Sequence, residues 1–302
     1  MSEDLIMPSE GHKAGFVNII GRPNVGKSTL MNQMVGERLS IITSKAQTTR
    51  HRIMGILNGE DFQIVYSDTP GIIEPQYKLQ NTMMHFVNVS LEDADILLVV
   101  TDVFEKKIED RVINRVMNLD IPVFLLINKI DLVEEERVKA QMDLWKDHFP
   151  EERILTLSAL EGRGVDKVFD LIIEQLPPHP PFFPKDELTN KSERFFASEI
   201  IREKIFLNYR QEVPYACEVV VTDFKNKEDI IFIRAEILVE RKSQKGIIIG
   251  KKGEALKKLG VQSREELEAF FDKKVFLEQH VKVEENWRSQ DQKLRRLGYH
   301  LE

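Results

Sequence analysis

The stretch that most constrains the fold is residues 21–28, which read GRPNVGKS and match the pattern G-x-x-x-x-G-K-S. An apolar run at 16–20 precedes it and suits a buried strand, while residues 29–35 read as the start of a helix. In that setting, backbone N–H groups and the helix N-terminus surround an anion. We therefore predict a nucleoside triphosphate, with Lys27 reaching the terminal phosphates and the Ser28 hydroxyl binding Mg²⁺. The predicted loop residues are Gly21, Arg22, Pro23, Asn24, Val25, Gly26, Lys27 and Ser28.

From residue 15 to 176, short apolar runs alternate with stretches of helical spacing. Continuous rather than alternating hydrophobicity indicates strands buried on both faces, as in a parallel sheet. The expected strands are 16–20, 62–67, 95–101, 121–127 and 154–157, with 53–58 as an antiparallel edge strand; the expected helices are 79–93, 109–118, 134–148 and 165–175. This pattern predicts an α/β domain with a doubly wound, mostly parallel sheet, whose ligands lie at the carboxyl ends of the strands.

A second motif, SDTPG at residues 67–71, closes the expected strand 62–67. A carboxylate at a strand end suits Mg²⁺, and the amide of a following glycine can sense a γ-phosphate. We therefore place Asp68, Thr69, Pro70, Gly71 and the next residue, Ile72, at the nucleotide.

A third motif, NKID at residues 128–131, closes the expected strand 121–127. The Asp131 carboxylate can accept hydrogen bonds from both N1–H and the 2-amino group of guanine. Adenine would leave that carboxylate unpaired, which is costly. The motif therefore predicts GTP rather than ATP. Asn128, Lys129 and Ile130 would brace the loop, and Ser158, Ala159 and Leu160 would close over the base.

The loop AQTTR at residues 46–50 carries two adjacent threonines. A threonine here can bind Mg²⁺ only while the γ-phosphate is present, which makes the loop a switch. Either Thr48 or Thr49 could do so; we favour Thr49, which gives Ser28, Thr49 and Asp68 as the metal ligands.

Ile72 stands where many GTPases carry a glutamine that orients the attacking water, and an isoleucine cannot do so. Asn24 is a candidate to help hold a monovalent cation, K⁺, beside the phosphates. Its alternative role is to shape the loop. The predicted catalytic set is Asn24, Lys27, Thr49 and Gly71.

Residues 177–186 hold five prolines in ten positions, which favours a stiff extended segment. We predict a disordered stretch at 1–14, a GTPase domain at 15–176, a linker at 177–190 and a second domain at 191–302. The net charge of −7 is divided unevenly, because residues 1–190 carry −10 and residues 191–302 carry +3.

The second domain has a different order of elements. Expected are a helix at 193–209, strands at 215–222 and 230–240, an apolar run ending in GKKG at 250–253, a helix at 254–271, a strand at 275–283 and a last helix at 286–297. The order α-β-β-α-α-β around a G-x-x-G loop predicts an α+β KH domain of type II, which clamps about four single-stranded nucleotides. A helix–turn–helix bend with incidental lysines is the alternative.

Seven basic residues and one acidic residue lie between 241 and 258, which suits a polyanion partner for this region. The charge alone favours the alternative of an ordinary solvated face, and the G-x-x-G loop within the stretch supplies the argument for RNA. We expect the lysines to meet phosphates and the isoleucines to form a groove for bases. The predicted RNA-binding residues are Lys245, Ile248, Ile249, Gly250, Lys251, Lys252, Gly253 and Lys257.

Residues 21–28, 47–50, 68–71, 128–131 and 158–159 together resemble the TrmE-Era-Der group of GTPases. A GTPase domain followed by a KH domain resembles the Era family within that group, over roughly 15–298. The resemblance implies GTP hydrolysis with a hydrophobic residue replacing the glutamine, and K⁺ stimulation through the asparagine at position 24. It also implies binding to the 3′ end of small-subunit ribosomal RNA, a role in assembly of the small ribosomal subunit, and a bacterial cytoplasmic protein partly associated with the inner face of the membrane. A monomer is expected.

Three alternatives compete with this interpretation. A tRNA-modification GTPase of the TrmE kind would need a folate-binding domain and a terminal cysteine motif, and a Der-like protein would need two GTPase domains; the sequence contains none of these. An RNA-binding regulator with little turnover would not need the intact Lys27, Ser28, Asp68 and Asp131. The polar N-terminus and the absence of a long apolar run favour a cytoplasmic location.

Overall fold

The computed structural model describes residues 11–105 and 110–299, and these form two compact units. Of the described residues, the first unit comprises those up to 40, in 49–74 and in 83–190, and the second comprises those in 41–48, in 75–82 and from 191 onward. Two loop segments that precede and follow the Asp68 strand therefore group with the C-terminal part of the chain. The predicted disorder of residues 1–10 lies outside the described residues.

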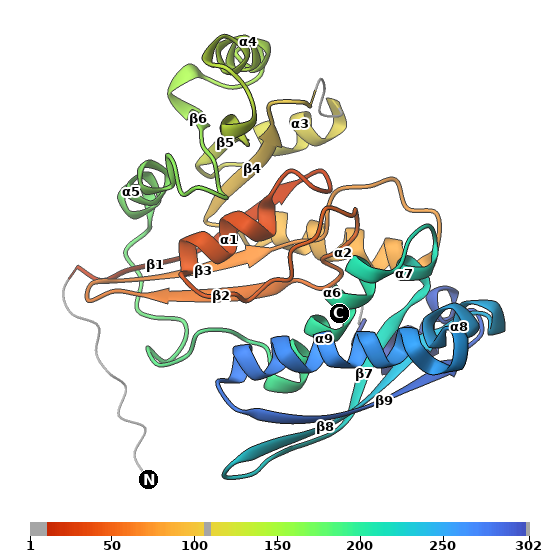
Figure 1. The fold of residues 1–302 in the computed structure, drawn as a ribbon. Helices are drawn as coiled ribbons and strands as arrows, with labels where there is room; N and C mark the ends of the chain where they lie inside the picture. The colour runs from red at the N-terminus through yellow and green to blue at the C-terminus, as the bar shows by residue number, and fades with distance from the viewer. Residues whose placement is uncertain (1–10, 106–109, 300–302) are drawn as a thin grey trace. The chain divides into compact units, whose positions relative to one another are not determined.

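The first unit is built on a six-stranded sheet in the order β2-β3-β1-β4-β5-β6 (Figure 1). All neighbouring strands are parallel except β2, which pairs antiparallel with β3. The predicted parallel sheet with an antiparallel edge strand is confirmed. The strands are β1 Lys13–Gly21, β2 Ile53–Asn58, β3 Phe62–Asp68, β4 Ile96–Asp102, β5 Val123–Asn128 and β6 Ile154–Thr156.

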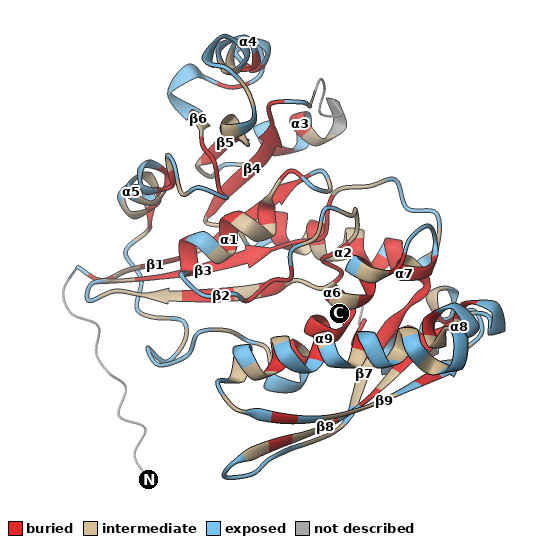
Figure 2. Ribbon diagram, viewed as in Figure 1, coloured by how far each residue is buried: buried red, intermediate tan, exposed pale blue. Residues whose placement is uncertain are grey.

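The helices of this unit cover both faces of the sheet (Figure 1). α1 packs with α5 on one face, and one core cluster joins α2, α3 and α4 to β4 and β5 on the other. Figure 2 shows the central strands as continuously buried, as their unbroken apolar runs predict. The helices are α1 Lys27–Val35, α2 Lys78–Glu92, α3 Asp110–Met117, α4 Glu135–Trp145 and α5 Val165–Gln175, with short 3₁₀ turns η1 Ile130–Leu132 and η2 Glu151–Arg153.

The predicted linker belongs to the first unit up to residue 190. Two linker residues, Pro178 and Thr189, form isolated antiparallel β-bridges with Lys13 and Gly55 of the sheet. The Gln63 side chain also forms hydrogen bonds with the backbone of Phe182 and Phe183 in the linker. The segment is extended, as its prolines require, but the sheet edge holds it. β1 likewise begins at Lys13, two residues inside the stretch expected to be disordered, because Lys13 pairs with Phe62.

The second unit has a three-stranded sheet in the order β7-β8-β9, with β7 antiparallel and β9 parallel to β8. Helices α6, α8 and α9 share one buried core with this sheet. The elements are α6 Glu193–Asn208, α7 Val213–Ala216, β7 Glu218–Asn226, β8 Ile230–Val239, α8 Lys242–Ile249, η3 Lys251–Gly253, α9 Glu254–Phe271, β9 Lys274–Val283, η4 Trp287–Ser289 and α10 Asp291–Arg296. The main elements follow the predicted order α-β-β-α-α-β.

Two predicted boundaries in this unit are wrong. The strand expected at 215–222 begins only at Glu218, because Val213–Ala216 form a helical turn with Pro214 in its first positions, where proline is tolerated. The helix expected at 286–297 is interrupted: Trp287 is buried in a 3₁₀ turn and the α-helix covers Asp291–Arg296 alone. Across the described residues, we find no helix with the length and apolar character that a membrane span requires.

Candidate GTP site and RNA groove

The phosphate loop joins the end of β1 to the start of α1, as the sequence predicts. Gly26, in the left-handed region at φ 99°, turns the chain into the helix. The Lys27 ammonium is buried and donates to the carbonyl oxygens of Gly21 at 3.1 Å and Arg22 at 2.9 Å. Burial lowers the pKa of Lys27 to about 8, against the opposing charges of Asp68 and Glu105. A buried amine held mainly by carbonyl groups is suited to an incoming phosphate.

The three predicted metal ligands lie together. Ser28 Oγ donates to Asp68 Oδ2 at 2.6 Å and lies 3.0 Å from Thr49 Oγ1, which donates to the same carboxylate oxygen at 3.2 Å. The second oxygen, Oδ1, is buried and has no hydrogen-bond partner among the described residues, and burial raises the pKa of Asp68. Two hydroxyls and a carboxylate with a spare buried oxygen are hard oxygen ligands, which fit Mg²⁺. The Thr48 hydroxyl instead bonds to Thr43 and to the carbonyl of Lys45.

The loop after β3 lies directly against the phosphate loop. A Cβ added to Gly71 would lie 2.7 Å from the Cα of Pro23, so only glycine fits there without displacement. The Ile72 amide donates to the Gly21 carbonyl at 3.0 Å, and Thr69 Oγ1 donates to the Ile19 carbonyl at 2.7 Å. The Ile72 side chain packs against the hydrophobic core, so it offers no polar group to a water.

The NKID loop is braced as predicted. Asn128 donates through Nδ2 to the Val25 carbonyl at 2.8 Å and accepts through Oδ1 from the amides of Lys129 and Ala159 at 2.8 and 2.9 Å. One amide thus ties together the phosphate loop, its own loop and the loop after β6. Asp131 lies half-buried in the turn η1, and Ile130 packs on the core behind it.

Residues after Ser158 form the last part of the site. The Ser158 hydroxyl accepts from the Glu161 amide at 3.2 Å, while the Leu160 side chain is 77% exposed. The Leu160 side chain thus lies at the surface, and contact of this segment with a base stays a prediction.

The G-x-x-G loop lies between α8 and α9. Gly250 and Gly253 have φ values of 70° and 82°, and Lys252 between them also lies in the left-handed region at 51°. Lys251 and Lys252 are exposed, and a Cβ on Gly250 would meet Ala255 at 2.5 Å. The loop can therefore present backbone and two ammonium groups to a phosphate chain.

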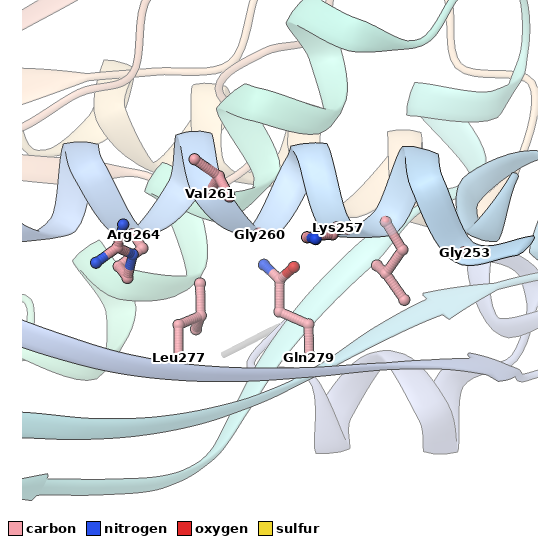
Figure 3. A pocket seen from close by; sticks show the side chains of 8 residues that line it. Gly253, Lys257, Gly260, Val261, Arg264, Leu277 and Gln279 are labelled. Carbon is pink, nitrogen blue, oxygen red and sulfur yellow. The ribbon is translucent and has the colours of Figure 1, made fainter.

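Beside this loop, an open groove of about 440 Å³ runs between α9 and β9 (Figure 3). Figure 3 shows Leu277 and Gln279 extending from β9 toward the helix, with Lys257 and Arg264 on the helix side. The lining residues are Gly253, Leu256, Lys257, Gly260, Val261, Arg264, Leu277 and Gln279.

Two parts of the chain match known protein families. Residues 16–129 match the family model described as 50S ribosome-binding GTPase, and residues 212–288 match that of the KH domain. The chain is 45% identical to GTPase Era of Geobacter metallireducens over 97% of its length and 100% of that protein, and 45% identical to a chloroplastic GTPase ERA1 of Zea mays over 95% and 71%. The chain belongs to the Era family of GTPases.

Two solved Era structures share its fold. One, with MgGDPNP and nucleotides 1506–1542 of 16S ribosomal RNA, has a TM-score of 0.91, 40% identity, and coverage of 96% of this chain and 100% of that one. The other is a single-substitution variant of Aquifex aeolicus Era bound to GDP·AlF₄⁻, at TM-score 0.90 and 40% identity, with the same coverage. Membership in the Era family makes this chain a GTPase that converts GTP and water to GDP and phosphate.

Two acidic residues of this Era-family site escaped the sequence prediction. Asp102 Oδ2 accepts from Lys129 Nζ at 2.7 Å, and the same ammonium donates to the Asn24 carbonyl at 2.6 Å. Glu105 lies 3.4 Å from Arg22 and contributes to the field at Lys27. Asp102 ends β4, so its place at a carboxyl strand end was the signal that could have found it.

The prediction that Ile248 and Ile249 form the groove is wrong. The Ile248 side chain is fully buried in the core of the second unit, and Ile249 packs against the same core, because α8 turns this face toward the sheet. Of the predicted RNA-binding residues, Gly253 and Lys257 line the groove, and the side chains of Gln279 and Leu277 across from them were missed. Their strand carries no motif in the sequence.

Proposed function

We propose that this Era-family chain is a GTP-controlled switch that binds the 3′ end of small-subunit ribosomal RNA and acts in assembly of the small ribosomal subunit. Support comes from a guanine-nucleotide site and a basic G-x-x-G groove in one chain. Further support is that a relative of 40% identity was solved with MgGDPNP and nucleotides 1506–1542 of 16S ribosomal RNA.

The observation that carries the proposal is the anchoring of residues 41–48 on α6. Arg202, fully buried, forms an ion pair with Glu199 and donates to the Thr48 carbonyl at 2.5 Å. Glu203, also buried, accepts from the Ile42 amide at 3.1 Å, and Lys45 donates to carbonyl oxygens at the end of α6. The residues that lead into the switch threonine are therefore held by the first helix of the RNA-binding part.

The second segment, residues 75–82, has its own contacts in the same unit. The Arg288 guanidinium lies 4.7 Å from the Tyr77 ring centroid, and Gln80 donates to Gln47 at 3.2 Å. Lys78 forms an ion pair with Asp291. Both segments that respond to a γ-phosphate in switch GTPases thus contact residues that follow the linker.

Thr48 and Thr49 are consecutive, so a displacement of the backbone at one residue also moves the other. Thr49 would ligate Mg²⁺ when GTP is bound, together with Ser28 and Asp68. Release of phosphate would free Thr49 and change the strain on the Thr48 carbonyl that Arg202 holds. Linkage requires the converse, that RNA binding favours the GTP state by the same factor.

In the hydrolysis step, Lys27 and the amides of the phosphate loop would hold the β- and γ-phosphates, and the Gly71 amide would donate to the γ-phosphate. The bound Mg²⁺ would neutralise charge on the phosphate oxygens. Because Ile72 cannot orient water, we assign charge stabilisation to K⁺ held with the help of Asn24. Equal turnover in K⁺ and Na⁺, or an unchanged K⁺ response in Asn24→Ala, would refute that role.

The central test compares RNA affinity in the two nucleotide states. The full chain, loaded with a non-hydrolysable GTP analogue or with GDP, is titrated with the RNA of nucleotides 1506–1542, and bound RNA from cells is crosslinked and sequenced. We expect tighter binding in the analogue state and enrichment of the small-subunit 3′ end. Equal affinities would refute the coupling, and enrichment of unrelated RNA would refute the proposed target.

We further propose a cytoplasmic location, which the polar N-terminus also favours, a monomeric state, and peripheral association with a membrane, which the family resemblance implies. Sedimentation velocity tests the monomeric state. Flotation with anionic phospholipid vesicles tests the membrane association. An RNA competitor in the flotation separates a lipid site from the basic groove.

A further inference from the structure

Two buried polar atoms beside the proposed Mg²⁺ ligands have no hydrogen-bond partner among the described residues. One is Asp68 Oδ1, the carboxylate oxygen that Ser28 and Thr49 leave free, and the other is the Ser40 hydroxyl. Asp68 is fully buried and Ser40 is 1% exposed. Buried polar atoms are normally paired, because leaving one unpaired is costly. Both atoms are therefore suited to a polar group that arrives with the ligand.

The Ser40 hydroxyl lies beside the Asp68 carboxylate. Burial raises the pKa of Asp68, while the charge of Lys27 and three neighbouring hydroxyls act to lower it. Those hydroxyls belong to Ser28, Ser40 and Thr49. The hydroxyls of Ser28 and Thr49 donate to Oδ2, so of these three it is the Ser40 hydroxyl that remains to be paired.

The backbone of Ser40 is fixed by α1, the helix that begins at the phosphate loop. Asn32 Oδ1 accepts from the amides of Leu39 and Ser40 at 3.0 and 2.9 Å, and Asn32 Nδ2 donates to the Ser40 carbonyl at 2.7 Å. Asn32 follows Ser28 by about one helical turn, so one helix positions both a metal ligand and Ser40. Ser40 is the last residue of the first unit before the segment 41–48. Its hydroxyl is therefore placed by the nucleotide-binding unit itself.

A water molecule bound to Mg²⁺ has the chemistry to pair with both atoms. Mg²⁺ gives up its hydration shell reluctantly and usually keeps several waters in protein sites. Each such water offers two protons, and a carboxylate oxygen beside a hydroxyl oxygen offers two acceptors. We propose that Ser40 is a positioning residue of the Mg²⁺ site, and that its hydroxyl and Asp68 Oδ1 together hold one water of the ion's shell. The inference rests on the proposed Mg²⁺ ligands and adds a residue that acts through Asp68 and water.

The test measures how much Mg²⁺ the full chain needs to retain GDP. Release of a fluorescent GDP analogue is followed while free Mg²⁺ is varied, and again with EDTA in place of Mg²⁺. Loss of an outer partner of a metal ligand typically costs 10- to 100-fold in metal affinity, so Ser40→Ala should raise the half-saturating Mg²⁺ concentration by about 10- to 100-fold. Release in EDTA and the denaturation midpoint of the metal-free chain should match the wild type, because the hydroxyl has no partner to lose among the described residues.

The matched control is Ser263→Ala. The Ser263 hydroxyl in α9 is also fully buried and has no partner among the described residues, so its loss should leave the Mg²⁺ requirement unchanged. An unchanged Mg²⁺ requirement in Ser40→Ala would overturn the proposal. Equal losses in EDTA and in Mg²⁺, or a lower denaturation midpoint, would also overturn it, since Ser40 would then only support the fold. Release of GDP from the wild-type chain that ignores Mg²⁺ would instead refute the proposed Mg²⁺ site itself.

Discussion

The nucleotide site and the RNA groove are built in opposite ways. At the nucleotide site, Asn128, Lys129 and Asp68 are already tied to neighbouring loops by their own hydrogen bonds. In the groove, exposed lysines flank an amide that has no partner among the described residues. The comparison indicates that the first site is organised before its ligand arrives, whereas the second presents exposed side chains that a ligand would order. Pre-organisation lowers the entropy cost of binding and sharpens selection.

The largest effect is expected from changing Asp131, the carboxylate predicted to recognise the base. This change tests whether the nucleotide site is organised for guanine before the ligand binds. In Asp131→Asn, the amide can still accept from guanine N1–H but presents a donor to the 2-amino group. We expect GTP affinity to fall at least about 100-fold, because a site built to pair a polar group rejects a mismatched partner strongly. Xanthosine triphosphate, which carries an oxygen in place of the amine, should bind better than GTP, as nucleotide titration would measure.

The control for that experiment is Asp147→Asn, an exposed aspartate after α4. It should leave both affinities unchanged. If Asp131→Asn keeps its preference for GTP, the guanine assignment from the NKID motif is wrong.

The anchor on α6 gives the next largest effect. Arg202→Met would leave Glu199 buried without its partner, and removing one member of a buried pair costs about 3–5 kcal/mol. Denaturant unfolding should detect that loss. Replacing both members, Glu199→Leu with Arg202→Met, should recover most of the stability, since a buried pair replaced by apolar residues is often neutral.

The double variant also removes the hydrogen bond from Arg202 to the Thr48 carbonyl, without leaving Glu199 unpaired. It should fold and bind GTP, yet the difference in RNA affinity between the analogue and GDP states should shrink. A double variant with the full difference would show that the Thr48 contact carries no coupling, and the coupling would have to run through residues 75–82.

Substitution of Gly71 tests how tightly the nucleotide site is packed. Gly71→Ala places a Cβ 2.7 Å from Pro23, and overpacking of this kind costs about 1–3 kcal/mol. We expect GTP turnover to fall by about tenfold or more, measured as phosphate release. Gly246→Ala in α8, where an added Cβ meets nothing within 4 Å, is the matched control and should leave turnover unchanged. Equal rates in both variants would show that the loop tolerates displacement.

The same contrast explains what the sequence could and could not predict. Residues 21–28, 68–71 and 128–131 carry chemistry in fixed spacings at strand ends, and the parallel sheet brings those ends together. Gln279 lies in a strand that carries no motif, and its place in the groove lining depends on α9, whose Gly260 faces it. Ile248 was misplaced for the same reason, because a helical face can point to a core or to a groove and the run of isoleucines fits both.

The smallest expected effect concerns the lysines of the G-x-x-G loop. Lys251 and Lys252 are exposed, so each should contact a phosphate through charge, with no base preference. Lys251→Ala and Lys252→Ala should each weaken RNA binding severalfold and reduce the salt slope of log K by about 0.7, the value for one contact to a single strand. Affinity measured between 50 and 200 mM salt would give the slope. Lys185→Ala, an exposed lysine of the segment at 177–190, is the control, and its slope should match the wild type. If either loop variant changed base preference instead of slope, then the groove would be organised before binding after all, and the contrast between the two sites would fail.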